Sequence, residues 1–238
     1  MQRGILMGTV KCVEQVDVLT LLTSLTQKID LPDSATTQYI QPILQQAFVT
    51  IQQNSACVAL LSELLEHEEA LLHHSFHVTV YALAIASKTT MSACELQQLA
   101  LAALLHDVGK TSVRAEVLNK PGKLTEDEFE EIKAHAVWGL RYLQAYTAFS
   151  RCIQDVVVQH HERLDGSGYP YHLTAEMIHP WAKIVAVSDV FDALTAERCY
   201  KKAMSHQEAL FVLKQEAASK LDAHYVTLLA ACIDPIHN

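Results

Sequence analysis

Apolar residues recur at intervals of three and four along most of the chain, with good helix formers between them, which is typical of amphipathic helices. Two capping boxes indicate helix starts, Ser92 with Glu95 and Thr125 with Glu128. The pattern predicts further helices over 150–161 and 180–197 and a loop over 113–124. Only seven Gly and six Pro occur in 238 residues, so helix breakers are few. We therefore predict an all-α fold.

The first 60 residues follow this pattern less clearly. The start mixes Val, Thr and Leu without a clean period, whereas 37–66 looks helical, and Pro32 and Pro42 are expected to break any single long helix. We interpret residues 1–60 as a partly helical N-terminal extension of unknown role, too short for a sensor domain of usual size, and residues 61–238 as the main domain.

Several polar residues fall on the apolar faces of predicted helices. In the helix that starts at Ser92, the apolar rows extend to His106 and Asp107, so both side chains are predicted to point inward. An Asp is rarely buried unless it is paired or binds a cation. The same alignment with apolar rows selects further residues: His74, His135, His160, His161 and Asp189. We expect these imidazoles and carboxylates to converge from several helices.

A metal site explains the whole set better than separate local causes. Any single inward His is more often a hydrogen-bonded core residue, and Asp107 or Asp189 alone fits a helix-end acceptor. Neighbouring helical residues diverge by about 100°, so His106 and Asp107 suit two ions side by side, about 3.5–4 Å apart. Ligands without thiolate favour two divalent ions of iron or manganese and leave zinc and nickel open.

Charge and composition exclude several classes of partner. The formal net charge is −9 and no long Lys/Arg run occurs, which argues against duplex nucleic acid. No apolar run reaches the roughly 18 residues of a membrane span. The six Cys are scattered without a CxxC pair and no secretory leader is recognisable, so we expect a reduced, cytoplasmic protein. A small phosphorylated ligand stays open, because a bound metal makes a site locally positive.

Five ordered blocks of sequence resemble the HD-GYP domain, a branch of the HD phosphohydrolases. The blocks are LLHDVGK (104–110), LNKPGKLTEDE (118–128), IKAH (132–135), HHERLDGSGYP (160–170) and VSDVFDALTAERCYKKA (187–203). The resemblance extends from about residue 60 to about residue 231. It implies an HD-domain helical core with additional C-terminal GYP helices. It also implies hydrolysis of the bacterial second messenger cyclic di-GMP to pGpG and, in many members, onward to GMP.

The resemblance assigns roles to individual residues. It implies as metal ligands the seven residues that the apolar rows select: His74, His106, Asp107, His135, His160, His161 and Asp189. Asp107 would bridge the ions and Lys110 would contact the scissile phosphate, although Lys110 also fits a charge at a helix C-terminus. Arg198 and Lys201 would hold the other phosphate, or form a solvated helix end.

The turn in HHERLDGSGYP is expected to end a helix and form a rim over the nucleotide. Gly168 would let the backbone approach the substrate, and Tyr169 would lean on a base or ribose. The alternative for Tyr169 is a loop anchor packed on the core. For Glu162 we expect an orienting or turn role, because metal sites commonly need residues that fix their ligands.

Departures from the family pattern keep other functions open. Some members hold a third metal with a Glu where this chain has Ala70, so we expect two ions. Leu164 stands where Trp is usual, which puts substrate affinity and specificity in question. One rival is a phosphodiesterase for another cyclic dinucleotide, such as cyclic GMP-AMP. A second is a catalytically weak binding or scaffold protein of second-messenger signalling. A homodimer and signalling-protein partners also stay open.

Overall fold

A computed structural model of the chain describes residues 17–29, 31–146, 149–197 and 202–234. Over these residues the fold consists of helices without any strand, so the all-α prediction is confirmed. The elements are α1 (Val18–Thr26), α2 (Ser34–Gln52), α3 (Ser55–His67), α4 (Glu69–Ala86), α5 (Ala93–Leu105), the 3-10 helix η1 (Val108–Ser112), α6 (Ala115–Leu118), α7 (Glu126–Lys133), α8 (His135–Gln144), α9 (Arg151–Gln159), α10 (Pro180–Thr195), α11 (His206–Glu216) and α12 (Ala223–Ile233).

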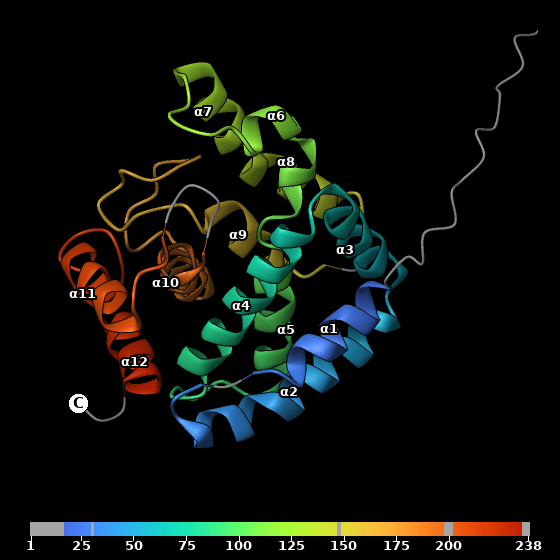
Figure 1. Cartoon of the computed structure of the whole chain (residues 1–238), viewed down its shortest axis with the longest axis vertical. Helices are drawn as coiled ribbons and strands as arrows, with labels where there is room; N and C mark the ends of the chain where they lie inside the picture. Colours follow the sequence, from blue (N-terminus) through green and yellow to red (C-terminus); the bar gives the residue numbers. More distant parts are fainter. Residues whose placement is uncertain (1–16, 30, 147–148, 198–201, 235–238) are drawn as a thin grey trace, which may run out of the picture.

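Helices α4 and α5 lie at the centre of the molecule (Figure 1). α4 packs against α5 and α10, and α5 packs in addition against α2 and α9. α11 and α12 cover one side, α1 to α3 cover the other, and α6 to α8 form a lobe at one end of the central pair (Figure 1). Residues far apart in sequence therefore meet between α4, α10 and the C-terminal ends of α5 and α9.

The N-terminal helices share the hydrophobic core of the rest of the chain. Leu22 of α1, Leu44 of α2 and Leu61 of α3 are fully buried in the same apolar cluster as the central helices. The interpretation of residues 1–60 as a separate extension stays a prediction. In the structure, the helices on both sides of that boundary pack together. This packing means that α1 to α3 support the centre of the fold.

Pro42 does not end a helix, contrary to the sequence-based prediction, because α2 continues through it. A proline in a helix leaves the carbonyl group four residues earlier without its donor. That carbonyl belongs to Gln38, and both Gln38 and Pro42 are exposed, so water can satisfy it. The buried face of α2 lies on other residues, such as Ile40 and Leu44, and is not interrupted.

From residue 92 onward the predicted helix boundaries agree closely with the structure, whereas the stretch 37–66 is divided into α2 and α3 at Gln53 and Asn54. Both capping boxes are formed, at the starts of α5 and α7, and α9 and α10 end within two residues of the predicted positions. The predicted loop over 113–124 contains the short helix α6, which sequence patterns did not indicate.

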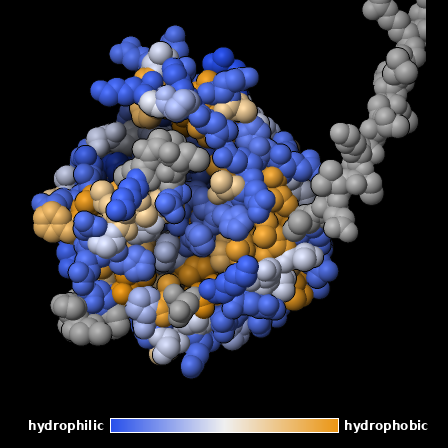
Figure 2. All heavy atoms as spheres, viewed as in Figure 1, coloured by the Kyte–Doolittle hydropathy of each residue, from blue (hydrophilic) through white to orange (hydrophobic). Residues whose placement is uncertain are grey.

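The surface is largely hydrophilic on the face shown in Figure 2, with a hydrophobic band at the junction of α1 with α3 and α4. A shallow hollow at that junction is lined by Leu25, Ile29, Phe76 and Val80. Among the described helices, none combines the length and apolar character that crossing a bilayer requires.

Candidate metal centre

Three histidines at helix ends share one arrangement of the ring. In His106, His135 and His160, Nδ1 faces the backbone carbonyl oxygen three residues earlier, at 2.7, 2.5 and 2.9 Å. Because a carbonyl oxygen only accepts, Nδ1 donates, and the neutral ring leaves Nε2 without a proton. Each carbonyl lies in the last turn of a helix, where acceptors lack a regular intrahelical donor. The helix ends thus aim three Nε2 atoms into the interior.

Asp107 lies among these rings with no exposed surface, and its two oxygens face different nitrogen atoms. Its Oδ1 lies 3.3 Å from His135 Nε2 and 3.7 Å from His160 Nε2. Its Oδ2 lies 3.3 Å from His106 Nε2 and 3.6 Å from His74 Nε2. The carboxylate therefore stands between two sets of imidazoles.

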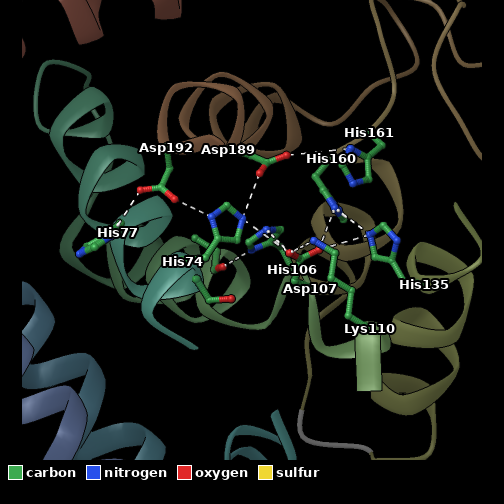
Figure 3. Close-up of polar contacts among 12 residues, drawn as sticks. His74, His77, His106, Asp107, Lys110, His135, His160, His161, Asp189 and Asp192 are labelled. Carbon is green, nitrogen blue, oxygen red and sulfur yellow. Dashed lines mark hydrogen bonds and ion pairs between the residues drawn. The ribbon is translucent and has the colours of Figure 1, made fainter. Parts of the chain in front are cut away.

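Asp189 spans the same two sets from the opposite side. Its Oδ1 lies 3.1 Å from His74 Nε2, and its Oδ2 lies 3.9 Å from His161 Nδ1. Figure 3 shows the side chains of α4, α10 and the segments after α5 and α9 pointing toward one another around Asp107. Two bridging carboxylates with imidazoles on either side form one continuous polar centre.

Two groups of candidate ligand atoms can be defined, each lying within 4.8 Å of one another. The His74 group consists of His74, His106 and Asp107. The His135 group consists of Asp107, His135, His160 and His161. They share Asp107, so two cations would lie next to each other. All seven predicted ligand residues are brought together, although metal binding by them stays a prediction.

Electrostatic surroundings differ between the histidines of the two groups. Burial lowers the pKa of His135 to about 3. Burial also lowers the pKa of His161 well below its usual range, and the proximity of the His160 and His135 imidazoles acts in the same direction. Burial also acts on His74, but hydrogen bonds to Asp189 and Asp192 outweigh it and raise the pKa of His74 to about 9. Without metal, the His74 ring is therefore protonated on both nitrogens and positively charged near neutral pH, while His135 and His161 stay neutral.

The two central carboxyl groups stay ionised despite their burial. Burial would raise the pKa of Asp107, but His106 and Lys110 hold it well below its usual range. Burial acts on Asp189 in the same way, and His74 holds its pKa well below the usual range. Two anionic carboxylates in the interior are the charge that a cation site needs.

The chemistry of these residues fits divalent metal ions. Asp107 Oδ1 and His106 Nε2 are buried without a hydrogen-bond partner among the described residues. Leaving a buried carboxylate oxygen and a ring nitrogen unpaired costs free energy that a cation bound to both would recover. The donors are imidazole nitrogens and carboxylate oxygens, a set that suits iron, manganese, zinc or nickel.

Lys110 connects this centre to a cavity. It lies on η1, and its Nζ contacts Asp107 Oδ2. A cavity of about 710 Å³ begins at Lys110, His74 and Asp192 and extends between α4 and the end of α10. Its volume lies within the roughly 300–1,000 Å³ range of small-ligand pockets. His74 and Lys110 can therefore meet a bound ligand from this side.

Gly109 lets η1 approach α8 closely enough for His135 to reach Asp107. A Cβ atom at Gly109 would lie 2.0 Å from the carbonyl oxygen of His135 and 2.5 Å from the backbone nitrogen of Gly139. No side chain fits at that distance, so the approach requires glycine. Sequence patterns did not identify this role, although Gly109 lies in the short segment between the predicted site residues Asp107 and Lys110.

Gly168 packs against the segment that carries His161. A Cβ atom there would lie 2.4 Å from Glu162 Cα and from Arg163 N, and 2.5 Å from the carbonyl oxygen of His161. The Tyr169 ring stacks on the His161 ring with centroids 4.7 Å apart. These contacts agree with a loop anchor, the alternative weighed for Tyr169. Contact of either residue with a substrate stays a prediction.

Glu162 fixes the same loop, which agrees with the turn role among the two roles expected for it. Its side chain is 2% exposed, and its carboxylate accepts hydrogen bonds from the backbone N–H groups of Tyr171 at 2.7 Å and Leu173 at 3.0 Å. The buried carboxylate thereby fastens the turn beneath Tyr169. The loop in turn places the Tyr169 ring against His161.

Asp192 is a site residue that sequence reasoning missed. It lies on α10, it is 2% exposed, and its Oδ2 lies 2.6 Å from His74 Nδ1. Its spacing from Asp189 could have identified it as a candidate site residue, because it follows Asp189 by three positions on the same helix face. Arg198 and Lys201, predicted to hold a phosphate, lie outside the described residues.

A family model and two curated relatives are similar to this chain. A family model described as HD domain matches residues 59–225. A cyclic di-GMP phosphodiesterase of Pseudomonas aeruginosa is 35% identical over 174 residues, which is 73% of this chain and 42% of the relative. The 3'3'-cGAMP-specific phosphodiesterase 3 of Vibrio cholerae is 38% identical over 149 residues, 63% of this chain and 32% of the relative. The chain thus spans less than half the length of either relative.

The fold is also similar to a solved structure, that of Bd1817, an HDG"Y"P protein from Bdellovibrio bacteriovorus. The TM-score is 0.61 at 18% sequence identity, and the match covers 92% of this chain and 73% of the other. At this identity the similarity concerns the fold.

Proposed function

The chain belongs to the HD domain family, and we propose that it is a metal-dependent phosphodiesterase that hydrolyses cyclic di-GMP to pGpG, GMP or both. The observation that carries the proposal is the centre itself: two groups of candidate ligands share the buried Asp107, and His74 and Lys110 line the adjoining cavity. The relative from Pseudomonas aeruginosa supports cyclic di-GMP as substrate. The similarity also supports the HD-GYP resemblance seen in the sequence.

Seven residues would hold two divalent ions: the His74 group with Asp189 would hold one, and the His135 group would hold the other. When bound, such ions stabilise negative charge on phosphoryl oxygens and make a nucleophilic water available near neutral pH. The protein fixes the ligands beforehand. Backbone carbonyls hold the rings of His106, His135 and His160, so little reorganisation is needed during the reaction.

Lys110 would bind the scissile phosphate from the cavity side. Its ammonium group is held by Asp107 and lines the cavity, so a phosphate entering there meets a fixed positive charge. A positive charge placed where negative charge develops stabilises the transition state more than the ground state. The leaving 3'-oxygen would take its proton from solvent or a nearby acid.

A second candidate substrate is cyclic GMP-AMP, because the relative from Vibrio cholerae carries that specificity in its name. Both substrates contain the same phosphodiester linkage, and the metal centre acts on that linkage. Specificity would therefore depend on the cavity walls, which present Glu69, His73, His77 and Asn119 to a bound base.

Iron or manganese is proposed as the metal, with zinc and nickel as alternatives, since imidazole and carboxylate ligands accept all four. A cytoplasmic location is proposed as well, and the four free cysteines among the described residues agree with a reducing compartment. Assembly as a homodimer or with signalling proteins stays a prediction.

The decisive experiment is hydrolysis by the full chain purified without oxygen. Metal content is measured first, and the protein is then incubated with Fe(II), Mn(II), Zn(II) or Ni(II) and with cyclic di-GMP, 3'3'-cyclic GMP-AMP or cyclic di-AMP. Chromatography should show pGpG or GMP with cyclic di-GMP as the best substrate. Bound nucleotide without product under every metal would indicate a binding or scaffold protein instead, and a faster reaction with cyclic GMP-AMP would select the alternative substrate.

A further inference from the structure

Asp192 lies one turn after Asp189 on α10 and points toward the same interior (Figure 3). Its Oδ2 lies 2.6 Å from His74 Nδ1, and its Oδ1 lies 3.4 Å from His77 Nδ1. Both oxygens thus face histidines of α4, on the side of the His74 ring away from Asp107. An ionised carboxylate only accepts hydrogen bonds, so His74 Nδ1 must be the donor.

His74 needs this partner because of its position in the helix. The rings of His106, His135 and His160 use backbone carbonyls in the last turn of a helix. His74 lies inside α4, which continues on both sides, so the carbonyl groups near it are engaged in regular helix hydrogen bonds. A side chain from another helix is then required to hold Nδ1, and Asp192 supplies it.

The consequence concerns the direction of the other ring nitrogen. With Nδ1 donating to Asp192, Nε2 of His74 faces Asp189 Oδ1 at 3.1 Å and Asp107 Oδ2 at 3.6 Å. Rotation of the ring, or a proton on Nε2 in place of Nδ1, would remove this nitrogen from the set. Partners of this kind orient metal-ligating histidines, and their loss typically lowers metal affinity about 10–100-fold.

We infer that Asp192 is a positioning residue: it fixes the His74 ring so that Nε2 binds the cation of the His74 group, and His77 holds the second oxygen of Asp192. This inference rests on the metal binding proposed above, and it assigns Asp192 no contact with the substrate. The His135 group has no contact with Asp192, so its affinity should not depend on it.

Metal binding by the full chain tests this inference without any nucleotide. The chain is stripped of metal and titrated with Mn(II) or Zn(II), and affinity and stoichiometry are measured by calorimetry and metal analysis. Wild type should bind two ions. Asp192→Ala should bind one ion normally and the other about 10–100-fold more weakly. Asp192→Asn should recover most of this loss, because its amide oxygen still accepts from Nδ1.

Two further variants test whether Asp192 acts by orienting His74 or whether loss of any carboxylate changes metal binding. His77→Ala should weaken the same ion by less than Asp192→Ala does, because His77 acts only through Asp192. Asp33→Asn, which removes a carboxylate paired with Lys88 at the start of α2, should bind both ions as wild type does. Wild-type affinity for both ions in Asp192→Ala would overturn the inference and leave the proposed function standing. Failure of the wild type to bind any metal would overturn both.

A spectroscopic measurement keeps the test valid if Asp192→Ala does not fold. In zinc-loaded protein with ¹⁵N-labelled histidine, His74 should show a protonated Nδ1 and a zinc-bound Nε2, with the signals assigned by comparison with His74→Gln. The same tautomer should persist in Asp192→Asn. A zinc-bound Nδ1, or a His74 ring without bound zinc, would contradict the role given to Asp192.

Discussion

The His74 group and the His135 group contain the same kinds of ligand but differ in what surrounds them. His74 lies against three carboxylates, of Asp107, Asp189 and Asp192, which hold a proton on its ring with a pKa of about 9. His135 lies beside other imidazoles, and burial lowers its pKa to about 3. A buried histidine beside a single carboxylate stays neutral and able to bind metal at once, whereas three carboxylates make a proton compete with the metal.

The shared carboxylate should be the most sensitive position. Asp107→Asn keeps the side-chain volume but removes the charge from both groups, so we expect turnover to fall by at least about 1,000-fold and both ions to bind weakly. Activity assays and metal analysis check this, with Asp155→Asn, whose carboxylate pairs with Arg151 on α9, as the matched control. Normal binding of either ion in Asp107→Asn would show that the groups are independent.

Substitution of Lys110 should affect substrate turnover without affecting metal binding. Lys110→Met removes the positive charge at the cavity wall, and we expect kcat/KM to fall by roughly 100-fold while two ions remain bound. Lys120→Met removes a lysine paired with Glu128 outside the centre and serves as the control, with activity unchanged. If Lys110→Met lost an ion instead, its contact with Asp107 would matter for metal binding, and its role toward phosphate would be withdrawn.

The close approach at Gly109 bears on the His135 group. Gly109→Ala places a methyl group against the backbone of α8, so we expect a loss of about 1–3 kcal/mol in the free energy of unfolding. The displaced α8 should also weaken the ion of the His135 group more than that of the His74 group. Urea denaturation and metal titration measure the two effects, and unchanged stability would contradict the packing seen around Gly109.

In the metal-free protein, the pH dependence of the free energy of unfolding should distinguish His74 from His135. His74 has its pKa raised from 6.5 to about 9, so its proton stabilises the fold fully below pH 6.5, and this contribution disappears as pH rises through 9. His135 has its pKa lowered from 6.5 to about 3, so the fold loses stability as pH falls below 6.5, where only the unfolded chain takes the proton.

Urea midpoints at pH 5, 7 and 9 test these opposite signs. Relative to wild type, His74→Gln should be most destabilising at pH 5 and least at pH 9, and His135→Gln should reduce the loss of stability between pH 7 and 5. Parallel curves for the two variants would show that the surroundings do not distinguish the histidines.

The sequence predicted the inward direction of His106 and Asp107 because apolar rows of one helix lead to them. The structure ends that helix at Leu105, yet both residues stay buried, since the following turn and η1 continue into the interior. The apolar rows indicate which way a segment faces even where the helix has ended. This is why the seven candidate ligands could be chosen without coordinates.

Contacts between distant segments could not be predicted in the same way. Nothing in the sequence near Asp192 indicates that it meets His74, because the two residues are 118 positions apart and meet only in the folded chain. Gly168 was expected to make room for a substrate, and its tight packing on residues 161–163 depends on how the loop folds back. Pro42 shows the same limit, because its effect depends on which side of α2 faces solvent.

The groups that accept a hydrogen bond from Nδ1 of the histidine rings are of two kinds, and only one kind can be removed by mutation. Main-chain carbonyls orient His106, His135 and His160, and a substitution that leaves the backbone in place cannot delete a carbonyl group. His74 alone among these four rings is oriented by a side chain, that of Asp192, which a single codon change can alter. Natural variation or laboratory evolution that tunes one ion of the pair while sparing its neighbour has its simplest route at this position.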